Sequence, residues 1–132
     1  MSSALEAVQR QLIMALNAHL PLTAEISGIF DGAPPRAAFP YIALATGASL
    51  DWSHKSGIGR ELSLALSIHD DGAAAARLHR LMALVEEALE PGLIDPEGWQ
   101  LVTFDYRRSR IIRSATSAWN GLIEYRARVL RD

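Results

Sequence analysis

The first regular pattern in the chain is a set of apolar residues that recur in steps of three and four. This spacing predicts a helix from about Ser3 to His19, because it places the apolar side chains on one face. Ser3 and Glu6 have the spacing of a capping box. Pro21 is expected to end the helix, since proline lacks an amide hydrogen. The apolar positions are Leu5, Val8, Leu12, Ala15, Leu16 and Leu20.

Alternating apolar and polar residues predict the strands. The clearest alternation covers residues 61–68, where every second side chain is apolar, as in a strand with one buried face. Residues 41–46 form an apolar run after the Phe39–Pro40 step, which disfavours a helix. Residues 99–106 and 119–130 predict two more strands. The last of these has Glu124, Arg126 and Arg128 on its polar face.

A second helix is expected to follow the strand at residues 61–68. Asp70 or Asp71 is the expected cap, and Pro91 ends the helix after about Glu90. Helix, hairpin, helix and hairpin in this order predict an α+β fold, with a mainly antiparallel sheet of about four to five strands and two helices packed on one face. The length favours a single domain over residues 1–132.

Two loops are candidates for contacts with other proteins. The connector from Gly28 to Pro40 is rich in glycine and proline and is expected to be an ordered surface loop. The segment from Asp51 to Arg60 contains two glycines and is expected to be a hairpin loop. Recognition often depends on ordered loops of a rigid scaffold. The candidate contact residues in these loops are Asp31, Pro34, Pro35, Trp52, Ser53 and Lys55.

Composition narrows the choice of class. Hydrophobic residues make up 49% of the chain and charged residues 21%, which is typical of a soluble globular protein. Apolar stretches are too short for a membrane-spanning helix, and no secretion signal is visible. The sequence has no cysteine, which excludes disulfides, thiolate nucleophiles and cysteine-based zinc sites. We therefore expect a cytoplasmic protein that has no membrane partner.

Charge is distributed unevenly along the chain. Residues 1–106 carry a net charge of −7, whereas residues 107–132 carry +5. Arg107, Arg108 and Arg110 are expected between two strands, and Arg126 and Arg128 on the final strand. The acidic body of one copy and the basic end of the next have complementary electrostatic fields. These five arginines are therefore candidates for a contact between subunits. A DNA-binding stripe and a merely solvated face remain alternatives.

Candidate catalytic groups are few. His69, Asp70 and Asp71 could hold a metal or supply a base, but a strand end followed by a helix cap also explains them. Ser53 and His54 are adjacent in one loop, which does not supply the geometry of a nucleophilic triad. We therefore expect no catalytic residue, no cofactor and no metal, and a non-enzymatic role.

Several ordered segments resemble one known family. They are the residues Phe30 to Pro35, Phe39 to Ile42, Asp51 to Ser53 with the following Lys55, Gly57, Gly59 and Glu61, and Gly121 to Ala127. In this order they resemble the tail completion proteins, also called tail terminators, of long-tailed phages and gene transfer agents. The similarity covers nearly the whole chain, although no single short motif decides it.

The resemblance implies a structural protein that forms a homohexameric ring at the head-proximal end of a tail. Such a ring stops polymerisation of the tail tube and joins the tail to the head connector. The implied partners are other copies of the chain, the tail tube protein and the connector or stopper protein, and DNA passes through the ring without specific binding. The implied location is the bacterial cytoplasm during assembly and then the particle. A connector or stopper subunit is the structural alternative, and a small metal-dependent hydrolase is the enzymatic one.

Overall fold

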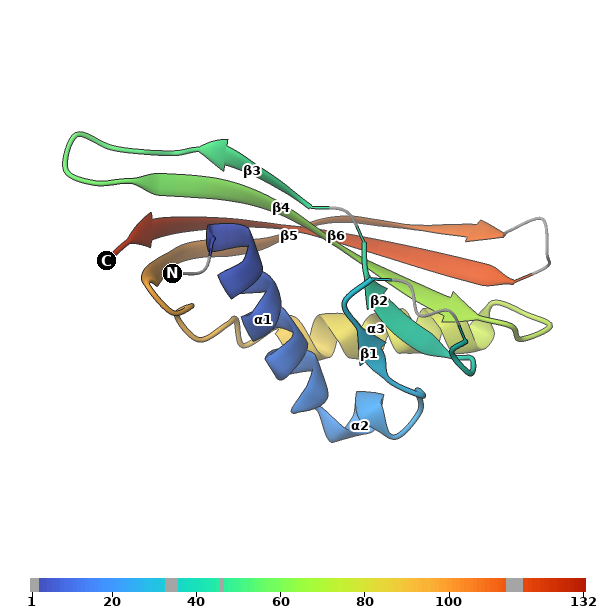
Figure 1. Ribbon diagram of the computed structural model, residues 1–132. Coiled ribbons are helices and arrows are strands. Elements are labelled where there is room, and N and C mark those ends of the chain that lie inside the picture. Colours follow the sequence, from blue (N-terminus) through green and yellow to red (C-terminus); the bar gives the residue numbers. More distant parts are fainter. Residues whose placement is uncertain (1–2, 33–35, 46, 114–117) are drawn as a thin grey trace.

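The computed structural model describes residues 3–32, 36–45, 47–113 and 118–132. Over these residues three helices and six strands form an α+β fold (Figure 1). The helices are α1 (Ala4–Asn17), α2 (Leu20–Thr23) and α3 (Ala76–Leu89). The strands are β1 (Ile29–Phe30), β2 (Tyr41–Leu44), β3 (Ala48–Asp51), β4 (Gly59–Asp70), β5 (Trp99–Arg113) and β6 (Trp119–Arg131).

The sheet is organised around β4, which has partners on both sides. β6 runs antiparallel to the whole of β4, from the Gly59–Leu130 pair to the Asp70–Trp119 pair. On the other side β3 pairs with the first part of β4 and β2 with the last part. β5 continues the sheet beyond β6, while β1 pairs with β2 in parallel. The sheet is therefore mixed. The segment from Gly28 to Pro40, which was expected to be an irregular loop, contributes the parallel strand β1.

The two predicted helices, α1 and α3, lie on one face of this sheet, as predicted (Figure 1). The predicted numbers of two helices and about four to five strands were too low, because the described residues also form the short α2 and a sixth strand. The apolar face of β4 is buried together with the apolar positions of α1 and α3 in one core. Burial of each large apolar side chain contributes roughly 1.5–3 kcal/mol. At Gly121 a Cβ atom would lie 2.7 Å from the Met82 sulfur, so the glycine lets α3 approach β6 closely. The buried residues of β4 are Leu62, Leu64, Leu66 and Ile68.

Three predicted boundaries were wrong. α1 ends at Asn17, and Pro21 lies in the first turn of α2, where its missing amide hydrogen is not needed. The cap of α3 is Ala75, with no side-chain hydrogen bond, because Asp70 still belongs to β4. β5 extends to Arg113 instead of ending at residue 106. The predicted cap of α1 is correct, since the Ser3 hydroxyl accepts from the Glu6 amide at 3.1 Å.

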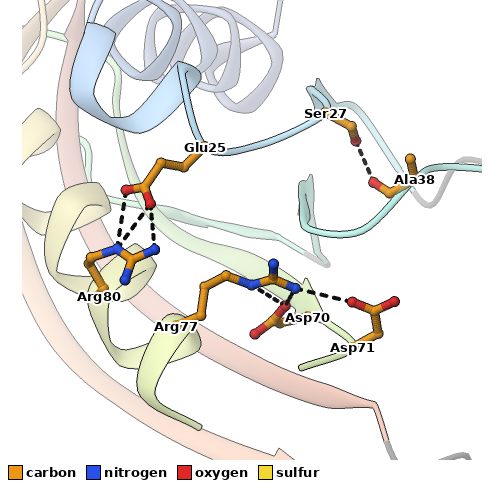
Figure 2. Close-up of polar contacts among 7 residues, drawn as sticks. All are labelled: Glu25, Ser27, Ala38, Asp70, Asp71, Arg77 and Arg80. Carbon is orange, nitrogen blue, oxygen red and sulfur yellow. Dashed lines mark hydrogen bonds and ion pairs between the residues drawn. The ribbon is translucent and has the colours of Figure 1, made fainter. Parts of the chain in front are cut away.

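Ion pairs tie α3 to the elements around it (Figure 2). The Arg77 Nε–H donates to the buried carboxylate of Asp70 at 2.8 Å, and a terminal nitrogen of the same guanidinium contacts Asp71 at 3.1 Å. One turn later, the Arg80 Nε–H donates to Glu25 at 3.0 Å. These contacts connect the start of α3 to the end of β4 and to the segment after α2. Within the described residues, no helix has the length and apolar character needed to cross a membrane.

Candidate assembly surface

The face of the sheet opposite the helices carries the charged side chains that the sequence singled out. The strand register places them in rows across β4, β6 and β5, with Glu61 opposite Arg128 and Glu124 opposite Arg108. We call this surface the open face. It contains a hollow of about 570 Å³ between the strands. The charged residues that line the hollow are Glu61, Arg107, Arg108, Arg110, Glu124 and Arg126.

Three of the five candidate arginines are paired within the chain. Arg128 lies 3.3 Å from Glu61, and Arg126 lies between Glu61 at 3.9 Å and Asp105 at 3.7 Å. Arg108 pairs with Glu124, and the hydrogen bond between them raises the pKa of Arg108. These acidic partners were not predicted from the sequence. The sign that could have revealed them is the position of Glu61 and Glu124 on the polar faces of neighbouring strands.

Arg107 and Arg110 have no ion pair among the described residues. They were expected between two strands, and this was wrong, because both belong to β5. A register shift between Tyr106 and Arg108 marks a β-bulge. The bulge inserts an extra residue into β5, so that Arg107 and Arg108, although consecutive, both line the hollow. The open face therefore presents unpaired positive charge along its β5 edge.

The hairpin between β3 and β4 projects from one end of the sheet (Figure 1). Its loop is held by Ser53, whose hydroxyl donates to Asp51 at 2.5 Å and accepts from the Gly59 amide at 3.1 Å. Hydrogen bonding from Ser53 and the nearby Arg60 guanidinium lower the pKa of Asp51. Ser53 thus shapes the loop. Lys55 is exposed near its tip.

Trp52 connects the hairpin to the open face. The Arg128 guanidinium lies over its ring at 5.5 Å, within the range of a cation–π contact, and the His54 ring meets it edge-on at 4.6 Å. Asp31 is exposed elsewhere, at a hollow of about 310 Å³ beside α1. Pro34 and Pro35 lie outside the described residues. The structure therefore brings Trp52 and the arginines together and places Asp31 in a separate region.

The groups considered for metal chemistry have other contacts. Asp70 is fully buried against Arg77, and Asp71 contacts the same guanidinium. The His69 ring stacks on Tyr41 at 4.6 Å, its Nε2 lies 3.0 Å from the Ser67 hydroxyl, and burial lowers its pKa. In the part of the chain that the structure describes, no three histidine or acidic side chains are grouped to hold a metal ion.

Fold and surface together define an α+β protein whose distinctive features are a charged open face and a projecting hairpin. A model of the family described as tail completion protein gp17 matches residues 10–130. The chain belongs to this family, and its role is that of a structural tail completion, or tail terminator, protein. A search of the curated proteins found no match.

Two solved structures are similar to the chain. One is a chain in a structure titled as the virion of a native gene transfer agent particle, with a TM-score of 0.82 and 26% identity over 98% of this chain and 99% of that chain. The other is the gp17 protein of bacteriophage SPP1, with a TM-score of 0.64 and 19% identity over 92% and 88%. The second shows that the fold is shared. Both agree with the resemblance found in the sequence.

Proposed function

We propose that six copies of this chain close into a ring at the head-proximal end of a phage-like or gene transfer agent tail. There the ring ends polymerisation of the tail tube and joins the tail to the head connector. The observation that carries this proposal is the likeness, over nearly the full length of both chains, to a component of a gene transfer agent particle. A protein with this role works through its surfaces, so the proposal includes no catalytic residue, cofactor or metal.

The proposed partners follow from that position. Besides copies of itself, the chain would contact the tail tube protein on one side and the connector or stopper protein on the other. DNA would pass through the ring without specific binding, and no membrane takes part. The chain would act as a single domain and assemble in the bacterial cytoplasm before it becomes part of the particle.

Ring closure sets a physical requirement on the subunit. Each copy must present two unlike surfaces that fit each other. Such a heterologous contact closes into a ring only if the rotation between neighbouring copies adds up to one full turn. The basic edge of β5 is one surface available for such a contact, and the projecting β3–β4 hairpin is another surface that neighbouring proteins could reach. We assign Trp52, Lys55 and the arginines of the open face to contacts between subunits or with neighbouring proteins. We assign a further contact to Asp31 and the surrounding segment from Gly28 to Pro40.

Deletion of the gene tests the function. Cells that lack the protein should make filled heads and separate tails, while a wild-type copy restores joined particles. Electron microscopy of lysates and the titre of infectious or transducing particles give the readout. Joined, active particles from the deletion strain would contradict the proposal. Capture of the connector protein without the tail tube protein in a pull-down would favour a connector or stopper subunit instead.

The hairpin contact has its own test, because Lys55 is the only lysine in the sequence. An amine-reactive reagent should modify Lys55 readily in the free protein, where it is exposed at the hairpin loop. We expect at least a several-fold slower reaction in intact particles, measured by mass spectrometry of the digested protein. Equal reactivity in the two states would remove the hairpin tip from the proposed contact surfaces.

A further inference from the structure

We propose that a groove between α3 and β5 is the acceptor site for a second copy of this chain, and that the basic outer half of β5 from that copy occupies it. This inference rests on the proposed function and deepens it, because it names two unlike surfaces that would meet around the ring. The acceptor groove lies on the face of the sheet that carries the helices, whereas the donor arginines lie on the open face.

The groove has aromatic walls and an acidic rim. Its volume is about 520 Å³, and it lies between the second half of α3 and strands β5 and β6. The Phe104 and Tyr125 rings stack at 4.8 Å, and Tyr106 meets Tyr125 edge-on at 5.8 Å. Tyr106 is 46% exposed, which is high for a large aromatic side chain on a sheet. The remaining lining residues are Ala83, Glu86, Glu87, Leu89 and Glu90.

Negative charge on the groove is not compensated within the described chain. Glu86 and Glu90 have no ion pair there, and the contact of Glu87 is with His19 at 3.7 Å. The last turn of α3 contains no basic residue. Carboxylates four residues apart repel each other, and the negative end of the helix dipole adds to the unfavourable field. A cation supplied by another molecule would relieve both effects.

Carboxylates beside aromatic rings suit a guanidinium better than an ammonium ion. Arginine stacks on aromatic faces and donates two parallel hydrogen bonds to a carboxylate. The chain shows the aromatic half of such a contact elsewhere, where Arg113 lies over the Trp119 ring at 4.9 Å. The chemistry of the groove thus selects an arginine-bearing segment as its occupant.

The outer half of β5 is that segment. Arg107 and Arg110 are exposed and have no ion pair among the described residues. They line the hollow of the open face, whereas Phe104 and Tyr106 of the same strand line the groove. Because the two sets point to opposite faces of one strand, a chain cannot place these arginines in its own groove. The complementary charges can therefore meet only between two copies.

Placement on opposite faces of the sheet makes the contact heterologous. Residues rise about 3.3 Å each along a strand, so the segment that ends at Arg113 reaches about 20 Å beyond Tyr106. The donor arginines and the acceptor groove of one subunit face in opposite directions, so a single neighbour cannot engage both. Repeated contacts of this kind continue around a ring or along a filament, unlike a two-fold contact, which stops at a dimer.

Cysteine cross-linking tests the contact directly, since the chain has no cysteine of its own. Particles would be made with the double variant Glu90→Cys/Arg110→Cys and treated with a short bismaleimide. The matched control is His79→Cys/Arg110→Cys, in which the first cysteine lies at an exposed position near the start of α3, away from the groove. We expect a ladder of covalent multimers from the first variant on a denaturing gel and only monomer from the control.

Charge reversal provides a second readout. Glu90→Arg should lower incorporation of the chain into particles by on the order of tenfold, and the added change Arg110→Glu should restore most of it, because the pair is then reversed. Thermal unfolding checks that each variant is folded. Three results would overturn the inference while the proposed function stands. They are monomer only from the Glu90/Arg110 cysteine pair, ladders of equal strength from the control pair, and unchanged incorporation of a folded Glu90→Arg protein. Particles that lack the chain altogether would contradict both.

Discussion

Asp70 is the one charged residue that is fully buried in the described part of the chain. A carboxylate in this position is stable only with a partner, and Arg77 supplies two hydrogen bonds to one of its oxygens. Asp70 stood out in the sequence for other reasons, as a candidate helix cap and a candidate metal ligand. Neither pattern shows that the two side chains meet, because six residues of turn and helix separate them.

Replacement of Asp70 measures this pair. Asp70→Asn keeps the shape but removes the charge, and we expect a loss of about 1.5–3 kcal/mol in the free energy of unfolding, as for a hydrogen bond to a charged group. Asp71→Asn is the matched control, since Asp71 contacts the same guanidinium from an exposed position and should change stability by less than about 0.5 kcal/mol. Urea unfolding of the two variants gives the comparison. Equal losses would contradict the role of burial.

His69 makes stability depend on pH. Burial between the Tyr41 ring and the sheet disfavours the imidazolium and lowers the pKa of His69 in the folded protein. The unfolded chain keeps the ordinary value near 6.5, so it takes up a proton first as the pH falls. This contribution to stability is therefore complete above about pH 6.5 and decreases below it.

Unfolding curves at pH 7.5 and pH 5.5 test this. The free energy of unfolding of the wild type should fall between these values by more than that of His69→Gln. NMR titration of the His69 ring should show the lowered midpoint directly. His79→Gln, at an exposed position of α3, is the control and should keep the wild-type difference. A His69→Gln protein with the full wild-type dependence would be incompatible with this explanation.

At the scale of elements, strands with strict alternation could be predicted well and those with a bulge could not. β4 alternates from Leu62 to Asp70 and β6 from Gly121 to Leu130, so their buried faces were assigned correctly from the sequence. In β5 the bulge at Arg107 interrupts the alternation, and the strand was predicted to end there. β1 has only two residues, which is too short for a periodic pattern. It is a strand because Ile29 pairs with Ile42 in β2, and the sequence does not show this pairing.

The same limit applies to the candidate surface. The positions of Arg126 and Arg128 on the polar face of β6 follow from alternation alone. Their pairing with Glu61, and the aromatic contact of Arg128 with Trp52, depend on the register between β4 and β6 and on the path of the hairpin. Such contacts join residues far apart in sequence, and no local pattern contains them.

The β3–β4 hairpin depends on a close backbone contact at Gly59. A Cβ atom there would lie 2.3 Å from the Trp52 carbonyl oxygen and 3.0 Å from a methyl carbon of Leu130. Gly59→Ala should therefore destabilise the fold by about 1–3 kcal/mol, because the carbonyl belongs to the backbone and cannot rotate away. Gly57→Ala is the control, since no atom lies within 4 Å of its added Cβ. Thermal or urea unfolding of both variants is the measurement, and a neutral Gly59→Ala would contradict the described approach of the two strands.

On the scale of the whole molecule, the sheet separates two kinds of surface. Its open face and hairpin carry the arginines and Trp52, while its helix face carries the acidic groove beside α3. The charge asymmetry of the sequence suggested a basic end and an acidic body, and the structure places the arginines without an ion pair on the open face and the acidic residues of α3 on the helix face. A subunit of this design can contact an identical subunit through unlike surfaces, as closure of a ring requires.

Copies of this chain are proposed to form a ring where the tail meets the head. Cryo-electron microscopy of intact particles gives the decisive test. The structure of this chain would be fitted into the map of the head–tail junction. We expect a single ring of six copies between the last ring of the tail tube and the head connector, with α3 of each copy next to β5 of its neighbour. Density at that position that another polypeptide explains, or copies of this chain placed elsewhere in the particle, would contradict it.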